Sequence, residues 1–149
     1  MNNPRTNRSR IAIIALAAPL ALLVDARDLG AELGEPSVET LRSLVEDYAH
    51  AVETNNRELA LRYVHPRSPQ RSEIDATLRD QLASYLERAR TSDLEPSRLP
   101  DGTISAKVGQ EIVRVSGMKF TRGTRRSIYH FRELGGSWLI WGIEEVSFL

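Results

Sequence analysis

Three histidines, His50, His65 and His130, are the first candidates for chemistry in this chain. None of them stands in a spacing such as His-x-x-x-His, which would bring two imidazoles to one helix face, so no metal site is expected. His65 is expected at the end of a short helix, where a surface cap is favoured over a catalytic base. Cysteine is absent, no serine has a Gly-x-Ser-x-Gly context, and no glycine-rich phosphate loop is present. No cofactor is therefore expected.

A carboxylate near the end of the chain is the next candidate. Glu144 shares the alternation of Trp138 and Ile140, which predicts that these three side chains face the same way. Burial would raise the pKa of this carboxyl group and could make Glu144 a general base at the mouth of a pocket.

The stretch from Arg126 to Phe148 must position these groups. It consists of two apolar runs joined at Gly135-Gly136, which predicts a β-hairpin with a two-residue turn. Pairing about this turn places Phe131 opposite Ile140, His130 opposite Trp141 and Ile128 opposite Ile143. One face then carries Tyr129, Phe131, Trp138 and Ile140, and the other carries Ile128, His130, Leu139, Trp141 and Ile143. Because both faces are apolar, both are expected to be covered.

Apolar stripes upstream predict three helices, from Val38 to about Glu53, a short one stopped by Pro66, and one from Ser72 to about Thr91. A helical hairpin followed by a longer third helix is expected.

After these helices the periodicity changes to that of strands. A short strand from Leu94 to Leu99 is confined to an edge by Pro96, and a longer strand from Ile104 to Val115 is predicted to bulge at Gly109. A turn at residues 122–124 is expected to lead into the hairpin, with Arg125 in a solvated basic turn. Helices followed by an antiparallel sheet predict an α+β fold with the helices on one face.

Acidic and basic residues balance at 20 each, which gives no field to attract nucleic acid or an anionic membrane. Residues 1–26 combine an arginine-containing polar start, an apolar run from Ile11 to Val24 and small residues around Ala26, the layout of a secretory signal. An uncleaved membrane anchor and a cytosolic core helix remain as alternatives. Residues 27–36 are predicted to form a linker, and residues 37–149 the folded domain.

Two stretches resemble the nuclear transport factor 2-like superfamily, which includes SnoaL-like cyclases and ketosteroid isomerase. The first, from Tyr48 to Val64, resembles its first two helices, and the second, from Tyr129 to Glu145, resembles its last two strands. The resemblance implies a curved sheet wrapped around the helices as a cone, a cystatin-like α+β barrel, with a conical pocket and commonly a dimer through the outer face of the sheet. The superfamily contains enzymes and members without known catalysis.

Tyr48 falls where ketosteroid isomerase has its oxyanion-stabilising tyrosine, so the resemblance implies a phenol that could hydrogen-bond a developing enolate. The isomerase's carboxylate base is missing from its place, because no acid occurs between Val64 and Glu73. Tyr48 is therefore expected to be a packing residue with a polar tip, with ligand contact and catalysis as alternatives.

Two functions follow. The preferred one is an exported, noncatalytic module that binds a small apolar ligand or another protein, and the alternative is an isomerase, dehydratase or cyclase that uses Tyr48 with Glu144 or His65. The expected pocket lining is Tyr48, Tyr63, Tyr129, Phe131, Trp138 and Ile140. The expected homodimer interface is Ile128, His130, Leu139, Trp141 and Ile143. The protein is predicted to be periplasmic or secreted, or else anchored by residues 1–26.

Overall fold

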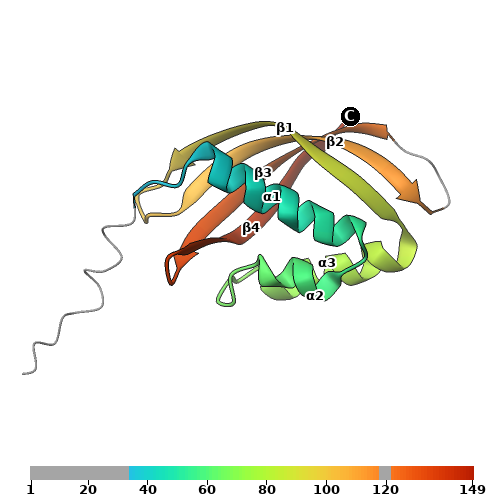
Figure 1. The fold of residues 1–149 in the computed structure, drawn as a ribbon, viewed down its shortest axis with the longest axis horizontal. Helices are drawn as coiled ribbons and strands as arrows, with labels where there is room; N and C mark the ends of the chain where they lie inside the picture. The colour runs from blue at the N-terminus through green and yellow to red at the C-terminus, as the bar shows by residue number, and fades with distance from the viewer. Residues whose placement is uncertain (1–33, 118–121) are drawn as a thin grey trace, which may run out of the picture. The chain divides into compact units, whose positions relative to one another are not determined.

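The computed structural model describes residues 34–117 and 122–149. The elements, in order, are α1 (Val38–Glu53), α2 (Arg57–Arg62), α3 (Arg71–Ser84), β1 (Leu86–Arg98), β2 (Ile104–Ser116), β3 (Arg122–Leu134) and β4 (Ser137–Phe148). The four strands form one antiparallel sheet in the order β1-β2-β3-β4, and the helices cover one of its faces (Figure 1). This confirms the predicted α+β fold.

The predicted signal segment, residues 1–26, and most of the predicted linker lie outside the described residues. In the part of the chain that is described, no helix has the length and apolar character needed to cross a membrane.

Helix α1 begins and ends where the sequence predicts. The side chain of Ser37 accepts a hydrogen bond from the backbone N–H of Thr40, which satisfies one of the free donors of the first turn. Its apolar stripe is buried, and Leu41 and Val45 are completely enclosed. Burying such a stripe against the sheet is what stabilises a helix of this length.

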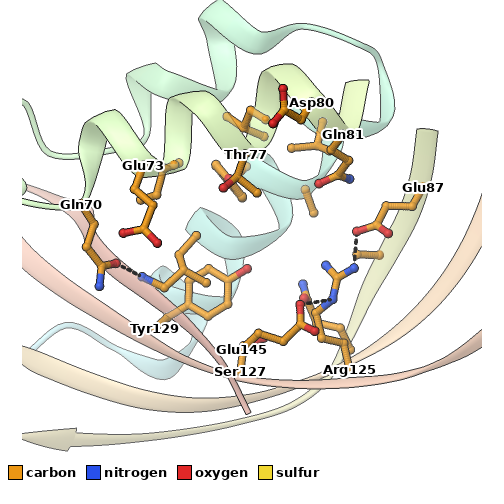
Figure 2. Close-up of a pocket in the computed structure, with 18 of the residues that line it drawn as sticks. Gln70, Glu73, Thr77, Asp80, Gln81, Glu87, Arg125, Ser127, Tyr129 and Glu145 are labelled. Atoms are coloured by element: carbon orange, nitrogen blue, oxygen red, sulfur yellow. Dashed lines mark hydrogen bonds and ion pairs between the residues drawn. The ribbon is translucent and has the colours of Figure 1, made fainter. Parts of the chain in front are cut away.

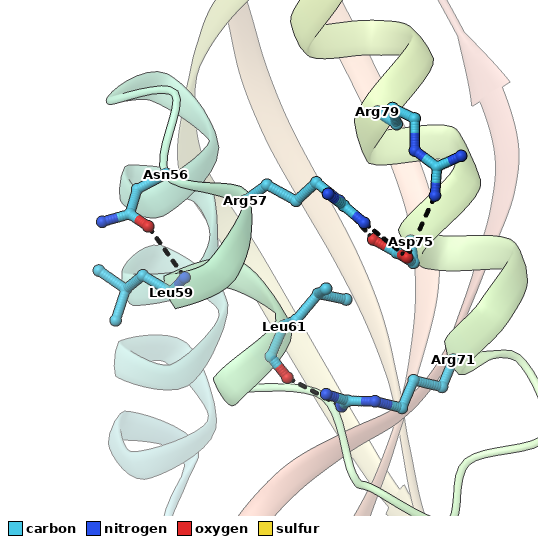
Figure 3. A network of polar contacts seen from close by, with 7 residues as sticks. All are labelled: Asn56, Arg57, Leu59, Leu61, Arg71, Asp75 and Arg79. Carbon is cyan, nitrogen blue, oxygen red and sulfur yellow. Dashed lines mark hydrogen bonds and ion pairs between the residues drawn. The ribbon is translucent and has the colours of Figure 1, made fainter.

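Helices α2 and α3 are fastened together by charged side chains (Figure 3). The guanidinium of Arg57 donates to both carboxylate oxygens of Asp75, at 2.5 and 2.8 Å. Arg71 donates to the backbone carbonyls of Leu61 and Val64, at 2.9 and 2.6 Å, and so satisfies acceptors left free where α2 ends. The short α2 is therefore held by its neighbour.

Helix α3 is shorter than predicted. It ends at Ser84, and Leu86 already begins β1, which runs to Arg98. The apolar spacing of Leu82, Leu86 and Ala89 suits a helix, but the last two pair with β2 instead, with Ala89 opposite Ile112. Sheet pairing overrides local helix preference here.

Strand β1 lies at the edge of the sheet, as the position of Pro96 predicts. The bulge predicted at Gly109 of β2 lies instead on β1, because the β1–β2 register shifts between Thr91 and Asp93 while β2 is continuous. A Cβ at Gly109 would lie 2.1 Å from a carboxylate oxygen of Asp93, so a larger residue there would require that side chain to move. The inner positions of β2 therefore keep one alternation from Ile104 through Gln110.

The hairpin turns at Gly135 and Gly136, both with positive φ, as the sequence predicts. Leu134 pairs with Ser137 and Phe131 with Ile140. Beyond that point the predicted pairs are wrong, because Trp141 is an extra residue in β4.

This β-bulge at Trp141 changes which face the following residues occupy. His130 pairs with Gly142, Tyr129 with Ile143 and Ile128 with Glu144. An extra residue reverses the alternation of everything after it. Ile143 therefore shares the inner face with Tyr129, and Glu144 lies on the outer face.

The segment after α2 closes part of the free edge of β4. The N–H of Ile140 donates to the carbonyl of Tyr63, and the N–H of His65 donates to the carbonyl of Ile140, both at 2.8 Å. Val64 forms a parallel bridge with Ile140 at this place. This connection ties the α2–α3 region to the middle of β4.

Candidate ligand-binding cavity

A cavity of about 540 Å³ lies between α3 and the inner face of the sheet, away from the hairpin turn (Figure 2). Its apolar wall includes Val52 of α1, Ile74 and Leu78 of α3, and Ile143 of β4. Its polar lining comes from α3 and from the inner positions of the strands. This size is within the range of sites that enclose small organic molecules.

A buried ion pair forms one side of the cavity. Arg125 of β3 donates to Glu87 of β1 at 2.5 Å, with side-chain exposures of 20% and 7%. The Nε atom of Arg125 also lies 3.6 Å from a carboxylate oxygen of Glu145, on β4 (Figure 2). A buried charge is tolerated only when it is paired, and this arginine has a carboxylate on either side.

Two tyrosines face the same space, Tyr48 from α1 and Tyr129 from β3. Burial raises the pKa of Tyr48 far above its ordinary value, and the neighbouring Tyr129 adds to the shift. Burial likewise raises the pKa of Tyr129, to about 12. Both phenols therefore stay protonated at neutral pH, so they can donate hydrogen bonds but cannot serve as bases.

Two amide side chains in the lining have a buried polar atom without a partner. These atoms are Nε2 of Gln81, on α3, and Oε1 of Gln110, on β2. Gln110 is only 1% exposed. The Nε atom of Arg125 is likewise buried without a hydrogen-bond partner. Because buried polar atoms are nearly always hydrogen-bonded, these two donors and one acceptor indicate places for another molecule's polar atoms.

Gln70 fixes the position of the β4 wall. Its Oε1 accepts the backbone N–H of Ile143 at 2.9 Å. A Cβ at Gly142 would lie 2.8 Å from that same oxygen, so a larger residue there would displace the Gln70 side chain and break this hydrogen bond. The hydroxyl of Ser68 donates to the carbonyl of Trp141 at 2.5 Å, next to this contact. The bulge and the start of α3 are thus held to each other.

The structure separates the residues that the sequence predicts for the pocket. Tyr48 and Tyr129 line the cavity. Phe131 and Ile140 are completely buried in the apolar core, and Tyr63 and Trp138 pack against that core, so these four are not part of the lining.

The two proposed partners of Tyr48 lie elsewhere. Glu144 is on the outer face, where its carboxylate is 3.0 Å from Nε2 of His130. His65 packs edge-on against Trp141, with ring centroids 4.9 Å apart, and its Nδ1 accepts the N–H of Arg67. Burial, together with Arg132 and Arg67, lowers the pKa of His65. The acid–base set of Tyr48 with Glu144 or His65 is therefore not assembled.

Four of the five residues predicted for an interface, Ile128, His130, Leu139 and Trp141, are half-buried and belong to the outer side of the hairpin. Trp141 also stacks under the guanidinium of Arg132, 4.0 Å from the ring centroid. The fifth, Ile143, is corrected to the inner face, where it lines the cavity.

The sequence-based predictions do not include the ion pair of the cavity, Arg125 and Glu87. Arg125 was expected in a solvated turn, but residues 122–124 belong to β3. Glu87 was expected on a helix and is on β1. The alternation of Arg125, Ser127, Tyr129 and Phe131 was the available signal, since it places all four on one face. Nothing local in the sequence marks Glu87. Within the described ranges, no group of His, Asp and Glu could hold a metal ion.

No family model matches the chain, and no curated protein matches it. Several solved structures are similar to it in fold. A protein of unknown function with a cystatin-like fold from Nostoc punctiforme has a TM-score of 0.61 and 12% identity, over 76% of this chain and 93% of that one. A candidate dehydratase of the nuclear transport factor 2-like family from Streptomyces avermitilis has a TM-score of 0.58 and 17% identity, over 71% and 91%. The chain has the nuclear transport factor 2-like fold.

A nuclear transport factor 2-like protein from Cytophaga hutchinsonii is similar over its whole length, with a TM-score of 0.57, 14% identity and 75% of this chain covered. Identities this low show the nuclear transport factor 2-like fold alone. Because that fold carries many activities, the function must be argued from the cavity itself.

Proposed function

We propose that the protein is a noncatalytic binding module that encloses a small amphipathic molecule in the cavity between α3 and the sheet. The observation that carries this proposal is that three buried polar atoms of the lining have no hydrogen-bond partner, Nε2 of Gln81, Nε of Arg125 and Oε1 of Gln110. A ligand with acceptor and donor atoms would satisfy them, while its apolar part would contact Val52, Ile74 and Leu78.

The electrostatics of the cavity support binding over catalysis. A general base needs a carboxylate or imidazole free to take a proton. Of the carboxylates in the lining, Glu73, Asp80 and Glu145 are exposed to solvent, and the buried one, Glu87, is engaged by Arg125. Tyr48 and Tyr129 have raised pKa values that keep them protonated. The isomerase, dehydratase or cyclase alternative loses the partners first suggested for Tyr48, since Glu144 and His65 do not line the cavity.

A fluorescent probe tests the cavity. N-phenyl-1-naphthylamine is uncharged at neutral pH and brightens in apolar sites. Thr77 lines the cavity on an exposed part of α3, so Thr77→Trp should fill the space without disturbing the core. Titration should show saturable binding that this variant weakens at least about tenfold through steric overlap.

Ala76→Trp is the matched control, because Ala76 is exposed on the same helix and does not line the cavity. It should bind like the unmodified protein. Equal binding by the Thr77→Trp variant, or no saturable binding by the unmodified protein, would contradict the proposal.

Export is proposed from the layout of residues 1–26. Expression of the full chain in a bacterial host should give a periplasmic product whose intact mass corresponds to a start near Arg27. An unshortened product in the membrane fraction would instead support the anchored alternative, and one in the cytosol would contradict both.

A homodimer through the outer face of the sheet is also proposed, because apolar side chains of the hairpin remain half-exposed there. Trp141→Glu and Leu139→Glu should each convert dimers to monomers in sedimentation equilibrium, since an interface core excludes charge. A monomeric unmodified protein, or dimers of both variants, would refute this interface.

A further inference from the structure

We propose that the molecule bound in this cavity is a small organic cation, an amine or related base carried on an apolar body. This inference rests on the proposed function, because it assigns the chemical class of ligand to the same cavity.

Carboxylates outnumber cations in the lining. Glu73, Asp80, Glu87 and Glu145 contribute acidic groups, and Arg125 contributes the guanidinium. Figure 2 shows Glu73 reaching from α3 into the space and Glu145 rising from the sheet opposite it, with Asp80 farther out on the helix. Arg114 stacks on the ring of Tyr85 at the border of the cavity, and counting it still leaves an acidic excess. Such a mouth attracts cations and repels anions.

A buried acceptor in the cavity independently favours a hydrogen-bond donor on the ligand. Oε1 of Gln110 is a hydrogen-bond acceptor without a partner, on a side chain that is 99% enclosed. An ammonium group can only donate, so it complements this oxygen, whereas a carboxylate or phosphate cannot. The unpartnered donors of the lining, Nε2 of Gln81 and Nε of Arg125, would be met by water or by an acceptor elsewhere on the ligand. The acidic mouth and the free acceptor thus select the same kind of group.

The arginine in the cavity does not reverse this preference. Arg125 is bonded to Glu87 at 2.5 Å, and Glu145 lies 3.6 Å from its Nε. An anionic ligand would have to displace a carboxylate that is almost fully buried. Leaving such a carboxylate without its partner is costly, so the N–H of Arg125 that is bonded to Glu87 is not available to an anion. Its Nε–H has no hydrogen-bond partner and can still donate to a neutral acceptor on the ligand.

Three probes of similar shape separate the contribution of ligand charge to binding from that of apolar contact. They are 1-naphthylmethylamine, 1-naphthalenemethanol and 1-naphthoate. Isothermal titration at neutral pH and low salt should give the order amine, alcohol, acid. Replacing Glu73→Gln and Glu145→Gln together should weaken amine binding about fivefold, because each exposed carboxylate contributes modestly, and leave alcohol binding unchanged. Added salt should weaken the binding of the amine alone.

The control is Glu46→Gln with Glu144→Gln, which removes the same charge from exposed residues outside the cavity. It should leave amine binding unchanged. Gln110→Met, which keeps the size but removes the acceptor, should weaken the amine severalfold, and a thermal melt of each variant checks folding.

The outcomes separate the two proposals. If none of the probes binds, or if Thr77→Trp does not weaken them, the cavity is not the site and both proposals fail. If Thr77→Trp weakens binding but the alcohol or the acid binds as tightly as the amine, the cavity is a binding site and the cation assignment alone is overturned.

Discussion

The inner face of the sheet has two halves that share the same strands but differ in what covers them. Near the hairpin turn, Ile104 and Phe131 pair and are buried against the core. Farther along the same strands, Gln110 pairs with Arg125 and both line the cavity. We call these the packed half and the cavity half. β2 and β3 pair without a register shift between the two halves, so along these two strands the difference lies in the side chains. Apolar side chains close the space in the packed half, and polar ones, beneath an α3 with few buried apolar residues, leave it open in the cavity half.

The largest expected effect is in the packed half. Phe131→Ala removes a completely buried ring and should lower the free energy of unfolding by about 4 kcal/mol. Ile143→Ala in the cavity half removes a half-buried side chain beside existing space and should cost roughly 1 kcal/mol. Chemical denaturation of both variants measures the contrast, and equal losses would erase the distinction between the halves.

The cavity half should depend on its ion pair. Arg125→Met leaves Glu87 buried and unpaired and should lower the free energy of unfolding by about 3 kcal/mol. Adding Glu87→Gln to it should restore much of that loss, because no uncompensated charge remains. A double variant no more stable than Arg125→Met would indicate that the arginine acts through packing instead.

A smaller effect should appear with pH at the edge where His65 packs on Trp141. The lowered pKa of His65 means that the folded state prefers the neutral ring, while the unfolded chain has the ordinary value of about 6.5. The stabilising contribution is therefore present above pH 6.5 and is lost as pH falls through the folded-state pKa.

Denaturation curves at descending pH should show this loss in the unmodified protein. His65→Asn retains an acceptor for the N–H of Arg67 but does not titrate, so its stability should fall less steeply. Parallel pH profiles for the two proteins would remove His65 as the cause.

The smallest effect on stability is expected at Glu144 and Glu145, which lie on opposite faces of the sheet. Their accessibility to a labelling reagent should nevertheless differ clearly. The chain has no cysteine of its own, so Glu144→Cys and Glu145→Cys each create a single thiol. Saturating N-phenyl-1-naphthylamine should slow maleimide labelling at position 145, in the cavity, and not at position 144, on the outer face. Protection at position 144 would contradict the observed register.

The fold was predictable because its signals are local. The stripe of α1, the Pro66 that stops the second helix and the Gly135-Gly136 turn each depend on neighbouring residues. The order of helices and strands then determines the architecture. The packed half was partly predictable too, since Phe131 and Ile140 pair close to the turn, before any irregularity.

The cavity half was not predictable from such signals, because it is assembled by long-range pairing. Glu87 faces inward only because β1 pairs with β2, while its own segment has the spacing of a helix. Ile143 and Glu145 face inward only because of the bulge before them. Alternation extrapolated from the turn assigns both to the wrong side, as it does Glu144.

The bulge has a consequence for how this chain can vary during evolution. Gly142 and Ile143 already pair with consecutive residues of β3, so a descendant lacking Trp141 would keep Ile143 and Glu145 in the cavity. It would lose only the contacts that the indole makes with His65 and Arg132. A relative that lacks this one residue would thus keep the binding cavity intact. Its last strand would align with β4 of this chain only if the alignment contains a one-residue gap at Trp141.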